Sequence, residues 1–328
     1  MEIANSESGQ YPLVTFAVIN FNGLSYLQET IPRLLEINYI NCEWLVVDNG
    51  SQDGSIEYLE HYSRVKLIKN PVLGSKNHGL NLILEQAAGQ YICFLDCDIV
   101  LDPYIDVLEL IRRASRPETG LLSMALQNRG EDTVKFYGLF LSYLSIIKRN
   151  KRLSIKEVQS IDDCLVVGVQ GAAFFAKAER FTELGTFDES VPFGGEDLDL
   201  GLRSLLLGYK NHLYSKEISL HIGMEERTNL SKMLKKYYPA HYGLFLTIFK
   251  NFSLEHVLFM LAGYLPYSFL KLLKDSLSYR TTSLFPLYGK ILINLVKNRQ
   301  KIALMRNAIQ AKRHLKRDEF FEIHAPLN

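Results

Sequence analysis

The chain has 328 residues, of which 47% are hydrophobic and 22% are charged, so a disordered chain and a fibrous chain are both excluded. The formal net charge is only +1, but it is unevenly distributed. Residues 1–223 hold 20 Lys and Arg against 29 Asp and Glu, whereas residues 224–328 hold 17 against 7. An acidic body followed by a basic tail predicts that the tail meets an anionic partner, either a membrane surface or nucleic acid.

The first segment and the cysteines indicate a cytoplasmic protein. Residues 1–12 are polar and lack the apolar run of a secretory signal, so we expect no signal peptide. Cys42, Cys93, Cys97 and Cys164 lie in apolar, strand-like runs with no CxxC pair. This pattern favours reduced core thiols over a disulfide framework or a zinc site.

The first hundred residues alternate between strand-like and helix-like patterns. In chain order we expect a strand at 13–21, a helix at 24–37, a strand at 44–47, a helix from 55, a strand at 65–68, a helix at 80–88 and a strand at 91–95. Asp102 and Pro103 then supply a cap and a first-turn proline for another helix. The alternation predicts an α/β fold with a mostly parallel sheet. Ligands bind such sheets beyond the carboxyl ends of the strands.

The pattern changes after residue 120. Shorter strands are predicted at 121–127, 134–139, 164–170, 172–176 and 217–221. From residue 227 onward the chain reads as helices rich in Lys, Tyr and Leu. We therefore expect three parts: a polar tail (1–12), an α/β domain (13–223) and a basic, amphipathic helical region (224–328).

Acidic residues follow two of the predicted strands. Asp48 comes after the strand at 44–47, and Asp96 and Asp98 come after the strand at 91–95. An Asp-x-Asp pair at a strand exit can place two carboxylates beside a divalent cation and a diphosphate. Helix capping or turn formation is the alternative. It stays open for Asp48 and is less favoured for the pair, because Asp102 is the expected cap.

A third acidic group opens a predicted helix after two glycines. Glu196, Asp197 and Asp199 lie in its first turn, where the helix dipole favours acids. Three acids in four residues exceed what capping needs, and one of them could act as a general base. His221 ends the strand at 217–221, where it is either a metal ligand or an ordinary core or surface residue.

In this order and spacing, the motifs resemble glycosyltransferase family 2, the inverting nucleotide-sugar transferases of the GT-A fold. The resemblance rests on VTFAVINFNGLSYLQETIPRLLE, LVVDNGSQDGSIEYLE, NHGLNLILEQAAGQYICFLDCDIVL, GAAFFAKAERFTELGTFDES and GGEDLDLGLRSLLLGY, within residues 13–223. It implies a GT-A nucleotide-diphospho-sugar transferase fold, with the C-terminal helices outside the recognised core. Rhamnosyltransferase-like members that serve polysaccharide biosynthesis are the type it suggests.

The resemblance also implies a role for each candidate residue. The nucleotide and the donor sugar would be bound by Asn20, Asn22, Asp48, Asn77 and Asp96. Asp98 and His221 would hold Mg²⁺ or Mn²⁺, which would stabilise the departing nucleoside diphosphate. Asp197, with Glu196 beside it, would take the proton of the acceptor hydroxyl in a single displacement that inverts the anomeric configuration. Arg203 would either meet phosphate or lie on the outer surface.

Two features depart from the family pattern. The NPV at 70–72 lacks an early glycine that many relatives have, although the NHG at 77–79 keeps the second part of the motif. The resemblance therefore does not assign Asn70 or Lys76 to the donor. The QxxRW signature of processive synthases is absent. We expect transfer of one or a few sugars, from a uridine or thymidine diphosphate sugar, to a glycan or a polyprenyl-diphosphate-linked acceptor.

The basic tail is expected to meet a membrane surface. Its longest charge-free run, residues 257–270, contains Pro266 and is too short to cross ~30 Å of hydrocarbon. Tyr264, Tyr267 and Tyr288 would suit the headgroup boundary of an anionic membrane, which places the protein peripherally at the inner face of the cell membrane. Packing on the transferase domain and formation of a homodimer are the alternatives. Nucleic acid is not expected, because no binding motif occurs and the tail is too apolar.

Two other functions are less well supported by the residues. A Rossmann dehydrogenase would need a glycine-rich loop after the first strand, where only Gly23 occurs. A non-catalytic, membrane-associated scaffold or sugar-binding module would not need Asp98 and Asp197 together. An enzyme therefore remains the leading interpretation.

Overall fold

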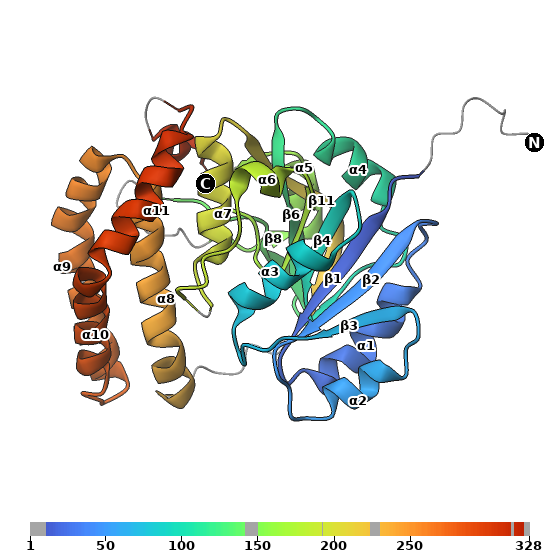
Figure 1. The fold of residues 1–328 in the computed structure, drawn as a ribbon, viewed down its shortest axis with the longest axis horizontal. Coiled ribbons are helices and arrows are strands. Elements are labelled where there is room, and N and C mark those ends of the chain that lie inside the picture. Colours follow the sequence, from blue (N-terminus) through green and yellow to red (C-terminus); the bar gives the residue numbers. More distant parts are fainter. Residues whose placement is uncertain (1–10, 142–149, 192, 224–229, 316–317, 325–328) are drawn as a thin grey trace, which may run out of the picture.

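The computed structural model describes residues 11–141, 150–191, 193–223, 230–315 and 318–324. An α/β body and a set of C-terminal helices lie side by side (Figure 1). The body begins with β1 (Val14–Asn20), α1 (Leu24–Leu35), β2 (Cys42–Asp48), α2 (Ser55–Glu60), β3 (Val65–Lys69), α3 (Lys76–Gln86) and β4 (Tyr91–Asp96). These are the predicted elements in the predicted order. The helix α3 begins earlier than expected, because Ser75 caps it by accepting the N–H of His78.

The strands form a mixed sheet. Its order is β3-β2-β1-β4-β10-β6-β11-β5, in which β3, β2, β1 and β4 are parallel. The later members are β5 (Ile99–Val100), β6 (Thr119–Asn128), β7 (Thr133–Phe136), β8 (Leu153–Ser154), β9 (Leu165–Val166), β10 (Ala173–Lys177) and β11 (Lys210–His221). The register pairs Asn20 with Asp48 and Ile19 with Asp96, so the carboxyl ends of β1, β2 and β4 meet at one edge.

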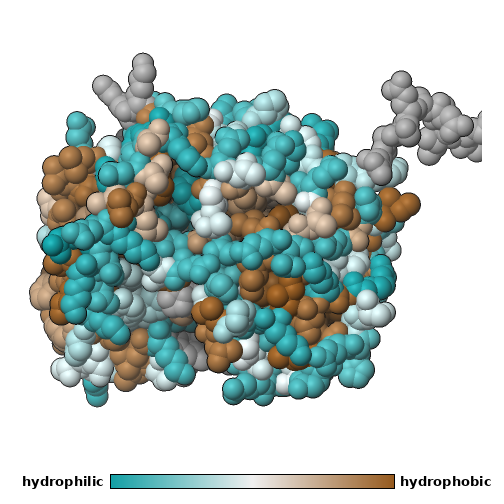
Figure 2. Space-filling view, viewed as in Figure 1, coloured by the Kyte–Doolittle hydropathy of each residue, from teal (hydrophilic) through white to brown (hydrophobic). Residues whose placement is uncertain are grey.

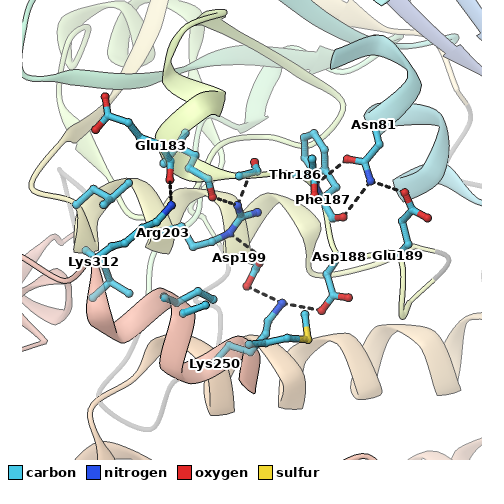
Figure 3. Close-up of a pocket in the computed structure, with 17 residues that line it drawn as sticks. Asn81, Glu183, Thr186, Phe187, Asp188, Glu189, Asp199, Arg203, Lys250 and Lys312 are labelled. Carbon is cyan, nitrogen blue, oxygen red and sulfur yellow. Dashed lines mark hydrogen bonds and ion pairs between the residues drawn. The ribbon is translucent and has the colours of Figure 1, made fainter. Parts of the chain in front are cut away.

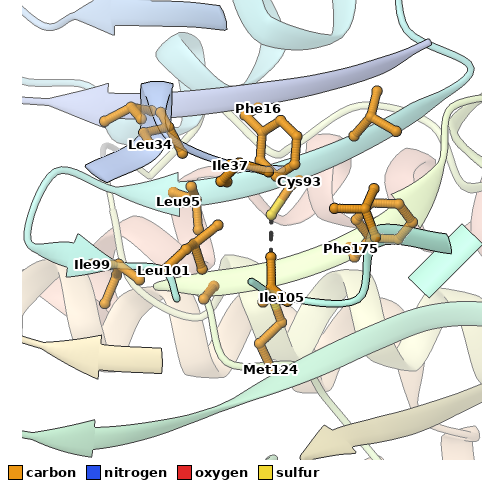
Figure 4. Close-up of a cluster of buried hydrophobic side chains, with 14 of the residues drawn as sticks. Phe16, Leu34, Ile37, Cys93, Leu95, Ile99, Leu101, Ile105, Met124 and Phe175 are labelled. Atoms are coloured by element: carbon orange, nitrogen blue, oxygen red, sulfur yellow. Dashed lines mark hydrogen bonds between the residues drawn. The ribbon is translucent and has the colours of Figure 1, made fainter. Parts of the chain in front are cut away.

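The sheet is buried on both faces, as its nearly continuous apolar strands predict. Every residue of β1 is buried. Along β4, Cys93 and Leu95 pack toward α1 and α4 (Val107–Ala114), as Figure 4 shows. Ile92 and Phe94 pack on the other face with α3. The four cysteines are free thiols, as expected.

The start of α4 differs from the prediction. The backbone closes a turn after Asp102, whose carbonyl accepts the N–H of Ile105 at 3.0 Å. The side chain of Asp102 accepts the N–H of Tyr104 at 2.9 Å inside this turn. Asp106 caps the helix instead, by accepting the N–H of Glu109 at 2.9 Å. The expected cap was wrong because the chain turns once more before the helix begins.

The C-terminal helices share a core with the body. They are α8 (Leu230–Asn251), α9 (Leu254–Ser278), α10 (Leu284–Lys297) and α11 (Arg299–Ala311), followed by the 3₁₀ helix η1 (Glu319–Glu322). Leu198, Leu202 and Leu205 of α7 (Glu196–Leu206) belong to the same buried cluster as Phe245 of α8. The smaller helices of the body are α5 (Ile155–Ser160) and α6 (Arg180–Leu184). The predicted boundary near residue 223 therefore crosses a continuous core.

The helix α9 is longer than the charge-free run suggested. It continues through Pro266 and has 25 residues. In the part of the chain that the structure describes, it is the one helix long and apolar enough to cross a membrane by length and composition, and 24% of its most apolar window is buried inside the protein. The sequence expectation missed this length because it considered only the charge-free run between His256 and Lys271.

Candidate active site

The end of β2 forms a tight, buried turn. The carboxylate of Asp48 is fully buried and accepts the side-chain N–H of Asn20 at 2.7 Å. It also accepts the N–H of Gly50 at 3.0 Å, and both the N–H and the hydroxyl of Ser51, at 2.8 and 2.7 Å. Asn22 joins from the β1 side, because its Oδ1 accepts the N–H of Gln52 at 2.8 Å. Asn20, Asn22 and Asp48 thus meet as predicted, and their contacts here shape the turn itself.

The exit of β4 brings Asp98 to His221. Residues 97 and 98 form a turn between β4 and β5, and β5 pairs with β11 so that Ile99 lies opposite His221. The Nε2 of His221 lies 3.1 Å from Oδ2 of Asp98, and both side chains are about one fifth exposed. Gly223 flanks this carboxylate so closely that an added Cβ would lie 2.0 Å from Oδ2. The predicted pair is therefore together and reachable.

This pair offers a cation one carboxylate oxygen and one imidazole nitrogen. No group of three or more His, Cys, Asp or Glu side chains suited to a metal gathers within the described residues. A site with two protein ligands leaves coordination positions open, and Mg²⁺ in particular is commonly held by one or two side chains together with water and substrate phosphates. The residues present fit a cation that is bound together with a diphosphate.

A lysine connects the two acidic motifs. The Nζ of Lys76, at the start of α3, lies 2.8 Å from Asp96 Oδ1 and 3.6 Å from Glu196 Oε1. It also donates to the carbonyl of Gly171 at 3.2 Å. Burial lowers the pKa of Lys76, but the Asp96 and Glu196 carboxylates outweigh it and raise that pKa above its ordinary value. The pKa of Asp96 is raised by burial, although Lys76 opposes the shift.

Asp197 lies at the first turn of α7, beside Glu196. Burial and the neighbouring Glu196 carboxylate raise the pKa of Asp197 to about 7. Its Oδ1 accepts the N–H of Leu198 at 2.8 Å, and a Cβ added to Gly171 would lie 3.1 Å from its Oδ2. One carboxylate oxygen of Asp197 is therefore hydrogen-bonded to the helix backbone, and the other lies close to the backbone at Gly171. A carboxyl that titrates near neutral pH is suited to general-base chemistry.

Comparison with known proteins agrees with this arrangement. Residues 15–174 match the model described as "Glycosyl transferase family 2". This segment, just under half of the chain, is similar to that family. It holds most of β1 and all of β2, β3 and β4, and with them Asn20, Asp48, Asp96 and Asp98. Glu196, Asp197 and His221 lie beyond the matched residues, and the structure brings them to the same edge of the sheet.

The similarity extends to curated relatives and to solved structures. A poly-beta-1,6-N-acetyl-D-glucosamine synthase of Staphylococcus epidermidis is 22% identical over 219 residues, which cover 66% of this chain and 50% of that protein. The chain thus spans about half the length of this relative. The mannosyltransferase PcManGT of Pyrobaculum calidifontis, in complex with GDP-Man and Mn²⁺, superposes with a TM-score of 0.55 at 16% identity, covering 93% of this chain and 86% of that one. S. aureus TarS 1-349, in complex with UDP-GlcNAc, gives a TM-score of 0.57 at 16% identity, covering 92% and 89%. These likenesses show an α/β, GT-A-like fold with a C-terminal helical region.

Two residues near the family 2 motifs serve the fold. Asn77 was expected to bind the donor, but its amide N–H groups are donated to the carbonyls of Asp188 and Val191, each at 2.9 Å. Arg203 is buried and donates to Asp199 at 3.1 Å and to the carbonyl of Leu184. The contacts of Arg203 match neither the phosphate role nor the outer-surface role considered for it. Both side chains hold the loop before α7.

The C-terminal helices contact the loop before α7, the helix that carries Asp197, directly. Gly194 and Gly195 have φ values of 95° and 81°, which favour glycine, and a Cβ on either would lie 3.2 Å from the backbone of α8. Lys250 of α8 is buried and lies 2.7 Å from Asp188 and 3.1 Å from Asp199. Figure 3 shows this lysine bridging the two carboxylates at the edge of a cavity of about 450 Å³.

Sequence reasoning missed Lys76 and Lys250. Lys76 stands directly before the NHG motif but outside the helix predicted at 80–88, and its contact with Glu196 joins residues 120 positions apart. Lys250 carries no signal in the sequence, because it is one of many lysines in a basic tail. Its burial is what distinguishes it, and burial is decided by how α8 packs on α7.

Proposed function

We propose that this protein is an inverting glycosyltransferase that moves a sugar from a nucleotide-diphosphate sugar to an acceptor hydroxyl. One observation carries the proposal: the exit of β4 and the first turn of α7 meet around Lys76, so that Asp96 and Glu196 face the same ammonium. This contact supports the proposal that a donor-binding motif lies next to a carboxyl suited to proton transfer. In a single displacement, the donor and the acceptor are bound at the same time, so the donor-binding motif and the proton-accepting carboxyl must lie close together.

Asp197 is the general base of the proposed reaction. Its raised pKa, about 7, matches the optimum for a base that works near neutral pH. The acceptor hydroxyl gives its proton to this carboxylate as the oxygen attacks the anomeric carbon and the bond to the diphosphate breaks. Because attack and departure occur on opposite faces of the sugar, the anomeric configuration inverts.

The diphosphate end of the donor belongs at the opposite side of the site. Asp98 and His221 would hold Mg²⁺ or Mn²⁺ there, and the cation supplies charge stabilisation for the leaving diphosphate. The mannosyltransferase with GDP-Man and Mn²⁺ has the same fold, which supports this placement. Asn20, Asn22 and Asp48 organise the turn against which we place the nucleotide, and Asp96 lies between it and Lys76.

The relatives support part of the proposed donor and product. We propose a uridine or thymidine diphosphate sugar as donor and a glycan or a polyprenyl-diphosphate-linked sugar as acceptor, in the assembly of a cell-surface polysaccharide or glycolipid. The TarS structure with UDP-GlcNAc and the poly-beta-1,6-N-acetyl-D-glucosamine synthase support uridine nucleotides and a polysaccharide product.

The test separates donor binding from chemistry. In a thermal-shift screen of nucleotide sugars, we expect stabilisation by one class of donor, and a larger shift with Mn²⁺ than without it. Asp197→Asn should keep this shift and lose about a thousandfold in transfer rate, whereas Asp98→Ala should lose the Mn²⁺-dependent part. The exposed Asp132 provides the control, because Asp132→Asn should change neither.

Two results would contradict the proposal. An undiminished transfer rate in Asp197→Asn would show that Asp197 is not the general base. A product that keeps the anomeric configuration of the donor, read by NMR at the first turnover, would exclude a single displacement.

A further inference from the structure

The two outer C-terminal helices expose large apolar side chains. On α9 the exposed fractions lie between 46% and 79% for Leu254, Leu258, Phe259, Phe269, Leu270 and Leu277. They run from the first residue of the helix to its next-to-last one. The helix α10 adds Phe285, Ile293 and Val296, which are between 39% and 64% exposed. We call these nine side chains the apolar face.

The apolar face lies at one end of the molecule. Figure 1 shows α9 and α10 on the side away from the parallel strands, and Figure 2 shows hydrophobic residues gathered along this margin. Single exposed apolar residues are ordinary on protein surfaces, whereas a contiguous group of this kind marks an interaction site. The face therefore needs an occupant.

The charges around the apolar face select that occupant. Residues 230–311 contain two acids, Glu255 and Asp275, and Asp275 already pairs with Lys271 at 2.5 Å. The exposed cations on α8 to α11 include Lys235, Lys236, Lys274, Lys290, Lys297 and Lys301. Apolar side chains bordered by lysines are the combination that binds an anionic bilayer. The apolar side chains contact the acyl chains, and the lysines contact the anionic headgroups.

We propose that α9 and α10 dock this protein on the surface of an anionic lipid bilayer through the apolar face. A second copy of the chain fits less well, because a two-fold contact would bring the same lysines together. Nucleic acid would contact the lysines but would provide no apolar surface for the leucines and phenylalanines. The proposal is independent of the proposed reaction, since none of these residues belongs to the active site.

The helix α9 lies on the bilayer and does not cross it, because its inner face is committed to the protein. Val257, Tyr264 and Leu272 are buried, and the hydroxyl of Ser268 lies 2.7 Å from that of Tyr288 on α10. Of the three tyrosines expected at the headgroup boundary, Tyr264 and Tyr288 belong instead to the core of the helical bundle. Tyr267 is 39% exposed and remains at the surface.

The first test is flotation of the full chain with lipid vesicles. We expect it to float with vesicles of phosphatidylglycerol and phosphatidylcholine, to float much less with phosphatidylcholine alone, and to lose part of its binding in ~1 M salt, where charges are screened beyond ~3 Å. Carbonate at high pH should release the bound protein, as it releases peripheral proteins. Failure to bind anionic vesicles would overturn the proposal, and retention in carbonate would overturn the surface position of α9.

Substitutions of exposed residues distinguish lipid binding through the apolar face from non-specific binding by other exposed apolar residues. Leu258→Glu combined with Leu270→Glu should weaken partitioning by at least about tenfold, whereas Ile40→Glu, at an 81% exposed position of the α/β body, should not. Lys274→Glu with Lys297→Glu should weaken binding to anionic vesicles. Circular dichroism, a thermal transition and a nucleotide-sugar thermal shift confirm that each variant is folded.

Light scattering without lipid tests the competing occupant. The proposal expects the apolar-face double variant and the native chain to have the same mass. A native dimer that the double variant converts to a monomer, together with unchanged flotation of that variant, would overturn it.

Discussion

Lys76 is the residue around which the candidate site is organised. Its ammonium contacts Asp96 from β4 and Glu196 from α7, and it therefore holds together two acidic motifs that would otherwise repel each other. The Glu196 carboxylate contributes to the raised pKa of Asp96, so the two motifs do repel each other. The same lysine lowers the pKa of Asp197, so a single cation acts on both acidic motifs.

This arrangement predicts the pH dependence of transfer. Asp197 acts as a base only when it is deprotonated, and its pKa is about 7. The value of kcat/KM, which reports the free enzyme, should therefore rise about tenfold per pH unit on the acidic side and level off above pH 7. A profile that is flat between pH 5 and 8 would contradict this assignment.

Two substitutions should move the acidic limb in opposite directions. Glu196→Gln removes a negative neighbour, so the pKa of Asp197 should fall and the limb should move to lower pH. Lys76→Met removes a positive neighbour that lowers this pKa, so the limb should move to higher pH. Each shift should be about one unit. Because the position of the limb is measured, loss of rate in either variant does not obscure the result; shifts of equal sign would contradict the electrostatic account.

Among the elements, α8 connects the C-terminal helices to the candidate site. It packs its backbone against Gly194 and Gly195, directly before α7 and the proposed base Asp197. It also places Lys250 between Asp188 and Asp199, and the backbone of Asp188 in turn receives the amide of Asn77. The loop before α7 is therefore held between α3 and α8, and this fixes where Asp197 stands.

Removal of the buried lysine should loosen this junction. Lys250→Met leaves Asp188 and Asp199 buried without their shared cation, which should lower the free energy of unfolding by about 3 kcal/mol. Urea denaturation measures the change. Lys235→Met, at an exposed position of the same helix, is the matched control and should leave the transition in place. Equal midpoints for the two variants would show that the bridge contributes nothing net.

At the scale of the whole molecule, the body and the C-terminal helices fold as a single unit. Leu198, Leu202, Leu205 and Leu206 of α7 are at most 5% exposed, and the cluster that buries them includes residues of α8 to α11. A chain ended after Gly223 would expose this face of α7 to water. The change of charge near residue 223 therefore does not coincide with a break in the buried core.

Truncation should for this reason abolish more than membrane binding. We expect residues 1–223 alone to aggregate or to lose the cooperative thermal transition of the full chain, because α7 loses its apolar partners. Differential scanning calorimetry of both chains measures this. A shortened chain that melts cooperatively and still binds the donor would show that the α/β body suffices by itself.

Much of the site could be predicted because it lies at strand ends. Once β1, β2 and β4 are recognised as parallel neighbours, Asn20, Asp48 and Asp96 must meet at one edge. The pairing of His221 with Asp98 was predicted through the family resemblance and is present. The hydrogen bonds of Asn77 could not be predicted, because its motif reports its place in the chain, whereas those bonds depend on the loop that packs over it.

The alternation of elements, the acidic motifs and the opposite charges of the body and the tail can all be recognised in the amino-acid sequence. Each follows from local pattern: apolar periodicity, strand ends and composition. Three other features required the three-dimensional packing: Lys76 joins the two acidic motifs, Lys250 is buried, and α9 turns one face inward and leaves the other uncovered. These features depend on contacts between segments far apart in the chain, where the identity of a residue does not reveal its partner.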